Sequence, residues 1–414
     1  RTAALKSKIC DAQNELNSVS ERLERIKGSR LWAMSKPARD ALHLMQRTRQ
    51  RLGAYGSIRG VMRKGDSKLQ ERAARASHGT GSFPDEARRR AEEETVFDLK
   101  IIFSILVPLY NTPKRFLEDM IGSVQAQTYG GWELCMADGS DDEHAYVGDI
   151  CRRYAAEDSR IIYKKLDSNE GISGNTNECL TLANGNYIAL FDHDDILHPS
   201  ALYETMKAIC EQDADYIYTD EVTFQSPDRK KFITLHYKPD FAPDNLLANN
   251  YICHFLAVRT SLARRLGGLS AEYDGAQDYD LLLRAVAALR ICPEPANEKL
   301  VANIPKVLYH WRCHEASTAE NPQSKQYAYK AGMRALRAHL AQCGIKGQVV
   351  PLKHVGFYEV VYPKELFAVR KDLGAVGGPV IRRGRIIGGR MKSSGQVYYE
   401  NLSVHYSGYL HRAV

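Results

Sequence analysis

The sequence lacks any apolar run long enough to cross a bilayer. A membrane-spanning helix needs about 20 consecutive apolar residues, whereas the most apolar stretch, residues 101–110, has the length of a strand and contains a proline. The N-terminal residues are charged and include no apolar segment of the signal-peptide kind. These absences predict a cytoplasmic protein that is at most peripheral on the inner face of the cytoplasmic membrane.

Closely spaced cysteine pairs are also missing. The nine cysteines are scattered, odd in number and never spaced as Cys-x-x-Cys. Such pairs are typical of zinc sites, and even sets at regular spacing are typical of disulfide frameworks. The sequence therefore argues against both kinds of site and favours a reducing compartment, with most cysteines as small buried apolar residues.

Acidic residues are scarce at the start of the chain. Residues 1–75 hold eighteen Lys or Arg against seven Asp or Glu, while the whole chain carries +7. Apolar residues from Leu5 to Ile26 recur at three-, four- and seven-residue spacings, which predicts a helical, coiled-coil arm. The arm is either a hairpin or homodimer contact, or an element on anionic lipid headgroups with Leu31 and Trp32 at the interface. Nucleic acid is not predicted as a partner, because the arm has no reader motif.

Beyond a polar stretch at residues 76–96, which is typical of a linker, residues 97–352 alternate strand-like and helix-like patterns. This alternation predicts an α/β domain with a mainly parallel sheet flanked by helices. Strands are expected at residues 101–110, 132–137, 160–165, 187–191 and 216–219, and helices at 113–127, 143–156, 171–183, 199–211 and 278–288. Because ligands bind beyond the carboxyl ends of strands in open α/β sheets, we expect the site where acidic clusters follow strands.

The acidic cluster Asp192-His193-Asp194-Asp195 directly follows an apolar strand. Its three carboxylates repel one another, and a divalent cation offsets that repulsion. Mg²⁺ and Mn²⁺ suit such oxygen ligands together with substrate phosphates. The alternative is structural: Asp195 precedes Pro199 and a predicted helix, whose N-terminus favours one carboxylate as a cap.

Further motifs have both a chemical and a structural interpretation. Asp138-Gly139-Ser140-Asp141-Asp142 offers an aspartate to a base or ribose, but it is also ordinary turn chemistry. Asp278 stands at the start of a predicted helix, as a general base or as a cap. His310 is able to bind a metal and Arg312 to bind phosphate, although a lone histidine beside aromatics is more often structural.

The order of these motifs resembles glycosyltransferase family 2, whose members are inverting enzymes of GT-A fold. The residues that carry the resemblance are 104–111 (SILVPLYN), 138–142 (DGSDD), 169–177 (NEGISGNTN), 185–195 (GNYIALFDHDD), 277–280 (QDYD) and His310. Several motifs in the family's order are more specific than any one of them alone.

The resemblance implies a GT-A domain that binds a UDP- or dTDP-sugar and an Mn²⁺ or Mg²⁺ ion. Residues expected at the donor are Pro108, Tyr110, Asn111, Asp138, Gly171, Asn175, Asp192 and Arg312. Asp192 and Asp194 match the family's Asp-x-Asp motif and, together with His310, are expected at the metal. Asp278 corresponds to the general base that deprotonates the acceptor hydroxyl, although Gln277 stands where many members have glutamate.

The Gln-x-x-Arg-Trp motif of processive family members does not occur. We therefore expect transfer of one or a few sugars to a glycan or polyprenyl-linked acceptor. The resemblance implies bacterial surface-polysaccharide biosynthesis of the O-antigen or rhamnan type. Residues 365–414 resemble the middle of a second module without its acidic motif, so they form no second active site. The alternative is a non-catalytic sugar-nucleotide-binding or scaffold protein of the same pathway.

Overall fold

The computed structural model describes residues 81–225, 232–289, 301–313, 326–352, 355–363, 380–382 and 385–388. The chain divides into two compact units, residues 1–71 and 72–414, and every described residue belongs to the second. The predicted arm, with its membrane and homodimer contacts, therefore lies outside the described residues. Within the segment 365–414 only a hairpin is described, formed by β12 (Val380–Arg382) and β13 (Arg385–Gly388).

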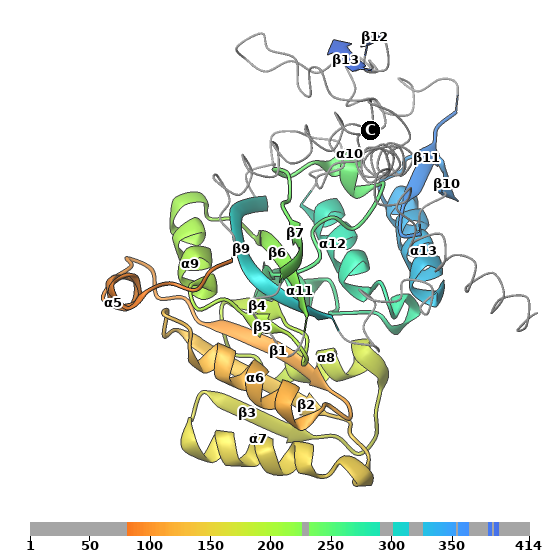
Figure 1. The fold of residues 1–414 in the computed structure, drawn as a ribbon. Helices are drawn as coiled ribbons and strands as arrows, with labels where there is room; N and C mark the ends of the chain where they lie inside the picture. Colours follow the sequence, from red (N-terminus) through yellow and green to blue (C-terminus); the bar gives the residue numbers. More distant parts are fainter. Residues whose placement is uncertain are drawn as a thin grey trace, which may run out of the picture. The chain divides into compact units, whose positions relative to one another are not determined.

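The domain is built on a nine-stranded sheet with strand order β3-β2-β1-β4-β8-β6-β9-β5 and with β7 beside β6 (Figure 1). The strands are β1 (Phe103–Leu109), β2 (Trp132–Asp138), β3 (Ile161–Lys165), β4 (Tyr187–Leu190), β5 (Ile196–Leu197), β6 (Tyr216–Gln225), β7 (Phe232–His236), β8 (Leu256–Arg259) and β9 (Val301–Cys313). Strands β3, β2, β1 and β4 run parallel, and β9 runs parallel to β6. The predicted α/β fold is confirmed, and the antiparallel β8 joins its two parallel groups.

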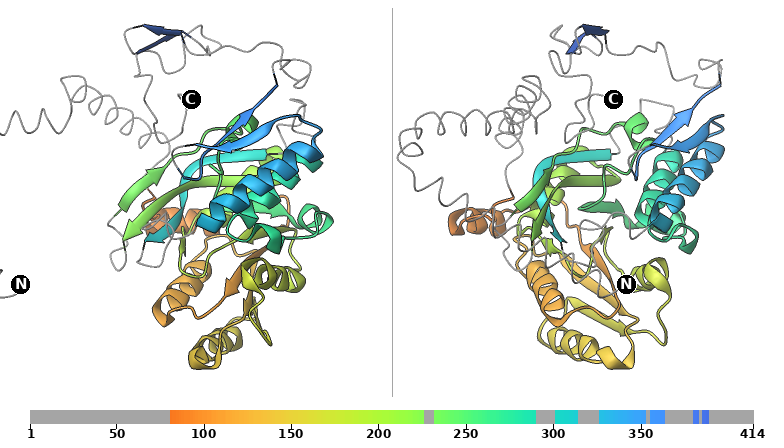
Figure 2. Two further views of the ribbon diagram at one scale, coloured as in Figure 1. Left: turned by 90° about the vertical axis from the view of Figure 1, so that its right-hand side faces the viewer. Right: turned by 45° about the vertical axis from the view of Figure 1, so that its right-hand side comes forward.

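Helices cover both faces of the sheet (Figures 1 and 2). They are α6 (Lys114–Gln125), α7 (Tyr146–Glu157), α8 (Gly171–Leu182), α9 (Ala201–Gln212), α10 (Pro243–Leu246), α11 (Thr260–Arg265), α12 (Gln277–Ala288) and α13 (Gln326–Gln342), with short 3-10 turns η1 (Asp142–His144) and η2 (Ala271–Tyr273). One apolar core lies under α6, α7 and α9, and the other lies under α8, α11, α12 and α13.

The alternation of side chains along β1 explains why this strand is apolar throughout. Ile105 and Val107 belong to the first core, while Leu106 between them belongs to the second. Successive side chains of a strand point to opposite faces, so a strand covered by helices on both sides has no position for a solvated residue. This is why residues 101–110 form a continuous apolar run.

Residues predicted as linker instead form a helix, α5 (Glu86–Glu93). Asp85 caps this helix by accepting a hydrogen bond from the Arg88 amide at 2.9 Å. On the side facing the domain, Glu92 is buried and accepts a hydrogen bond from the Thr128 hydroxyl at 2.8 Å. The linker prediction is wrong here, because an Arg- and Glu-rich run can satisfy its charges along the helix and against the domain without an apolar stripe.

The hairpin that follows α13 extends past residue 352, where the domain was predicted to end. It pairs β10 (Gln348–Pro351) with β11 (Tyr358–Val361), and the Tyr358 hydroxyl donates to the carbonyl oxygen of Tyr329 on α13 at 2.9 Å. None of the helices in the described ranges is long and apolar enough to cross a membrane.

Candidate active site

Three carboxylates meet in the loop that follows β4. Asp192, Asp194 and Asp195 each offer an oxygen, and these oxygens lie within 4.8 Å of one another. Asp192 and Asp194 are partly exposed, whereas Asp195 is fully buried. Burial, followed by the nearby charges of Asp194 and Asp192, raises the pKa of Asp195 well above its usual range. The donor set is the all-oxygen kind that Mg²⁺ and Mn²⁺ prefer.

Asp195 does not cap the next helix. The helix α9 begins at Ala201 after Ser200, and no side chain caps it. The Asp195 carboxylate instead accepts hydrogen bonds from the Tyr309 hydroxyl at 2.5 Å and from the Arg312 amide at 2.7 Å, both on β9. The helix-cap interpretation of the acidic cluster is therefore wrong, and the loop is fixed by the neighbouring strand.

Arg312 adds further contacts to this loop. Its Nε donates to the backbone carbonyl of Asp194 at 2.5 Å, and its Nη2 lies 3.1 Å from the Asp119 carboxylate on α6. The side chain is only 1% exposed, and the guanidinium lies over the Phe116 ring at 4.4 Å. In this arrangement Arg312 supports the acidic loop from within the domain, and its head is covered by protein.

Replacing Arg312 by methionine should lower the free energy of unfolding by about 3 kcal/mol, because it breaks a buried ion pair. The same change removes the donor to the Asp194 carbonyl, so Mn²⁺ affinity should fall in protein that is still folded. Chemical denaturation and a Mn²⁺ titration measure the two effects. Unchanged values in both would show that Arg312 does not support the loop.

His310, which was expected at the metal, lies away from the three carboxylates. Its Nε2 donates to the Gly81 carbonyl oxygen at 3.0 Å, and its ring stacks on His198 at 6.1 Å and meets Phe83 edge-on at 5.3 Å. Tyr309 and His310 are neighbours on β9, so their side chains point to opposite faces, and the short His310 side chain packs beside His198 and Phe83 instead of the carboxylates. A motif gives the sequence position of a histidine but not the face that it occupies.

A different histidine approaches the acidic loop. The Nε2 atom of His254 lies 3.4 Å from Asp192 Oδ2, and its ring stacks on Tyr309 with 5.0 Å between centroids. Burial lowers the pKa of His254, but the charges of Asp192, Asp278 and Glu221 outweigh burial and raise it to about 9. Local spacing in the sequence does not mark His254, because its partners come from distant parts of the chain.

Asp278 lies in the first turn of α12, which begins at Gln277 after a residue without a side-chain cap. Its Oδ2 accepts a hydrogen bond from Asn250 Nδ2 at 2.8 Å. The second acidic residue of this turn, Asp280, is buried and forms an ion pair with Arg284 at 2.6 Å. Asp280 therefore stabilises the helix, whereas Asp278 contacts a side chain from outside the helix.

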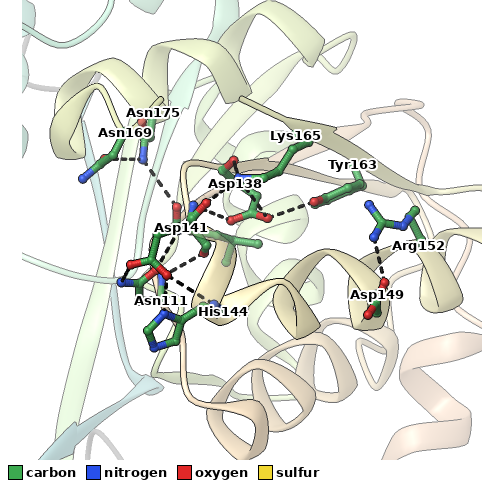
Figure 3. Close-up of polar contacts among 12 residues, drawn as sticks. Asn111, Asp138, Asp141, His144, Asp149, Arg152, Tyr163, Lys165, Asn169 and Asn175 are labelled. Carbon is green, nitrogen blue, oxygen red and sulfur yellow. Dashed lines mark hydrogen bonds and ion pairs between the residues drawn. The ribbon is translucent and has the colours of Figure 1, made fainter. Parts of the chain in front are cut away.

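A second polar cluster lies at the ends of β1 and β2 (Figure 3). Asp138 is 1% exposed, and its carboxylate accepts hydrogen bonds from the Ser140 amide at 2.8 Å and the Tyr163 hydroxyl at 2.9 Å. Lys165 lies 4.0 Å from the same carboxylate and donates to the Ser140 carbonyl oxygen at 2.5 Å. Asp138 thus closes a turn and also places a negative charge at the strand end.

Three asparagines surround this cluster (Figure 3). Asn111 has a positive φ of 50°, and its Nδ2 donates to Asp141 Oδ2 at 2.7 Å. Asn175 Nδ2 donates to Asn169 Oδ1 at 3.0 Å. A Cβ atom on Gly139 would lie 2.9 Å from Asn169 Cα and 2.9 Å from Asn175 Nδ2, so glycine lets the turn after β2 approach the start of α8 closely.

The structure places most of the expected donor residues along one edge of the sheet. Pro108 precedes Leu109, the last residue of β1. Tyr110 follows this strand and is 47% exposed. Gly171 begins α8 with a φ of 76°. The acidic loop extends this edge, because β4 pairs with β1. The Arg312 side chain lies behind the acidic loop, and that of His310 lies away from this edge, beside His198 and Phe83.

The chain matches a known family and is similar in sequence to known proteins. The sequence model described as Glycosyl transferase family 2 matches residues 104–267. Uncharacterized protein y4gI of Sinorhizobium fredii is 39% identical over 266 residues, which is 64% of this chain and 28% of that protein. O-antigen biosynthesis protein RfbC of Myxococcus xanthus is 31% identical over 280 residues, which is 67% of this chain and 21% of that protein. The chain thus spans less than a third of the length of either relative.

A solved structure is also similar. S. aureus TarS in complex with UDP-GlcNAc has a TM-score of 0.45 and 17% identity, over 59% of this chain and 68% of that chain. The family match at residues 104–267 includes both the acidic loop and the Asp138 cluster. Residues 104–267 therefore form a glycosyltransferase family 2 domain.

Proposed function

We propose that this chain catalyses inverting transfer of a sugar from a nucleotide-sugar donor to an acceptor hydroxyl. The proposal rests on one observation: the carboxylates Asp192 and Asp194 lie near a further carboxylate, Asp278. Asp278 accepts a hydrogen bond from Asn250 at 2.8 Å, and His254, four residues further along the chain, lies 3.4 Å from Asp192, so these two carboxylates lie near one another in the fold. A capping role needs only one carboxylate and does not account for this arrangement.

We infer that Asp192 and Asp194 hold a divalent cation, Mn²⁺ or Mg²⁺. When bound, such an ion supplies positive charge to the diphosphate as it departs. Asp195 would orient the loop from behind, since Tyr309 and the Arg312 amide engage its carboxylate. The contacts of Arg312 favour a positioning role over the phosphate contact implied by the resemblance.

We infer that the nucleoside of a UDP- or dTDP-sugar binds at the Asp138 cluster. The exposed ring of Tyr110 is suited to stacking on a base. The buried Asp138 carboxylate is held in one orientation by Ser140 and Tyr163, so it can accept a hydrogen bond at a fixed place. The acidic loop on the adjacent β4 would then receive the diphosphate.

The proposed reaction is a single displacement. Asp278 takes the proton of the acceptor hydroxyl while that oxygen attacks the anomeric carbon. A new carbon–oxygen bond forms as the bond to the diphosphate oxygen breaks, and the nucleoside diphosphate leaves with the electron pair. Attack opposite to the leaving group inverts the anomeric centre. A positioned general base typically contributes about 10²- to 10⁴-fold to such a rate.

We propose that the acceptor is a glycan or a polyprenyl-linked glycan of a bacterial surface polysaccharide, elongated on the cytoplasmic side. Support comes from the similarity to a protein named for O-antigen biosynthesis. The basic arm would hold the enzyme near a lipid-linked acceptor by attraction to anionic headgroups.

Deletion of residues 1–75 should reduce recovery of the protein with membranes while leaving hydrolysis of a soluble donor unchanged. The deleted arm carries eighteen basic against seven acidic residues, and basic segments bind anionic lipid surfaces. Sedimentation with vesicles of anionic and of neutral lipid measures the effect. Equal sedimentation of the full chain and the deletion variant would remove the lipid-surface role.

The experiment that tests the function is release of nucleoside diphosphate from a panel of UDP-, dTDP- and GDP-sugars with Mn²⁺. One donor series should be consumed, and a chelator should stop the reaction. If donors bind but none is consumed, with or without cell-envelope acceptors, the chain is a sugar-nucleotide-binding or scaffold protein.

A further inference from the structure

We propose that the short segment 250–254 holds the base Asp278 at a fixed place relative to the acidic loop, and that Asn250 is the positioning residue of that base. The segment precedes β8 and contains none of the motif residues that carry the family resemblance. The inference rests on the proposed function, because it concerns how two of its groups are held together.

One end of the segment binds Asp278. Asn250 Nδ2 donates to Asp278 Oδ2 at 2.8 Å, and Asn250 Oδ1 accepts a hydrogen bond from the Cys253 amide at 3.2 Å. The second bond fixes which way the Asn250 amide points, so its nitrogen faces the carboxylate. A carboxylate held by one oxygen keeps its other oxygen for an acceptor hydroxyl.

The other end of the segment contacts the acidic loop. His254 lies 3.4 Å from the Asp192 carboxylate and stacks on Tyr309. The Tyr309 hydroxyl in turn donates to Asp195. A continuous set of contacts therefore runs from the proposed base, through five residues of chain, to two carboxylates of the acidic loop.

A buried ion pair anchors the segment to the sheet. Lys238 and Glu221, each 3% exposed, lie 3.0 Å apart. Lys238 Nζ also donates to the carbonyl oxygens of Ile252 and His254, and Glu221 accepts a hydrogen bond from the His254 amide at 3.3 Å. Burying two charges is costly unless their hydrogen bonds are satisfied, and here the satisfying partners are the backbone groups of this segment.

The arrangement has a mechanistic consequence. The acceptor hydroxyl must lie within hydrogen-bond reach of the base while it faces the anomeric carbon, whose place is set by the diphosphate. A base on α12 and a metal loop after β4 belong to separate elements, so their separation needs a rigid connection. The segment 250–254 provides it.

The test is a double-mutant cycle of Asn250→Ala and Asp278→Asn, measured as release of nucleoside diphosphate from the donor that the wild type consumes. Asn250→Ala alone should lower kcat roughly 10- to 100-fold, the loss that small displacements of catalytic groups cause, with donor affinity unchanged. In the Asp278→Asn background it should cause no further loss. An equal loss in both backgrounds would overturn the proposal, since Asn250 would then act independently of the base.

The matched control is Asn245→Ala, five residues earlier on α10, which keeps the backbone carbonyl that accepts from the Ala248 and Asn249 amides. It should keep wild-type kcat, and thermal melting should show all variants folded.

Crystal structures of the wild type and Asn250→Ala test the proposal without an activity assay. A rotated Asp278 carboxylate in the variant supports it, and an unmoved one refutes it. A wild type that consumes no donor would defeat the proposed function instead.

Discussion

Replacing Asp278 by asparagine should lower turnover by about 10²- to 10⁴-fold, the contribution of a positioned general base, and leave donor affinity near the wild-type value. Asparagine keeps the size of the side chain but cannot take the proton of the acceptor hydroxyl. Its amide can still meet Asn250, which donates to Asp278 at 2.8 Å, so the first turn of α12 should keep its place. Transfer kinetics and calorimetric donor titration measure the two quantities separately.

The control for this change is Asp149→Asn. Asp149 lies on α7, its side chain is 74% exposed, and it forms an ion pair with Arg152 on the same helix at 2.8 Å. It should have wild-type kcat and wild-type donor affinity. Full activity of the Asp278 variant would discard Asp278 as the base, whereas joint loss of turnover and donor affinity would make it a donor ligand.

Replacing Asp194 by asparagine should abolish metal-dependent donor binding. The substitution removes one of two partly exposed carboxylates in the acidic loop but keeps the backbone carbonyl that Arg312 binds, so the loop should stay folded. Loss of a residue that hydrogen-bonds to a metal ligand lowers metal affinity about 10- to 100-fold. Loss of a ligand itself should therefore lower Mn²⁺ affinity at least about 100-fold. Electron paramagnetic resonance of free Mn²⁺ measures the affinity directly.

Asp149→Asn serves again as the control, because it removes the same charge from an exposed site elsewhere. Equal Mn²⁺ affinity in the wild type and the Asp194 variant would place the ion outside the acidic loop. Donor binding that is unchanged by a chelator in both proteins would remove the metal from the mechanism.

The fold was predictable from the sequence because the sheet imposes a strong local pattern. β1 and β4 are covered on both faces, which requires apolar runs, and the polar residues that follow them must lie at the sheet edge. Asp138 ends β2 and Asp192 follows β4, and both strands pair in parallel with β1, so the two residues lie at that edge. The family resemblance then gave these residues roles that composition alone does not give.

The parts that sequence reasoning missed depend on contacts between distant residues. His254 reaches Asp192 only because Lys238 and Glu221 fix its backbone. Arg312 was expected at a phosphate, but its guanidinium is covered and faces Asp119. Motif spacing predicts neither the neighbours of a side chain nor the strand face on which it lies.

The helix α5 illustrates the same limit for polar segments. Its residues have no apolar periodicity, and the sequence pattern therefore suggested a linker. In the structure Arg88 joins Glu92 on the same helix and Glu204 on α9. Charge pairs between separate elements stabilise a helix without leaving a hydrophobic pattern.

Calorimetric titration of the full chain with UDP, dTDP, GDP and their sugars, with and without Mn²⁺, decides whether the acidic loop belongs to a sugar-nucleotide site. One nucleotide series should bind tightly, its binding should need the metal ion, and Asp194→Asn should abolish it. If no series binds under either condition, the acidic loop is not a sugar-nucleotide site and the proposed transferase activity is wrong.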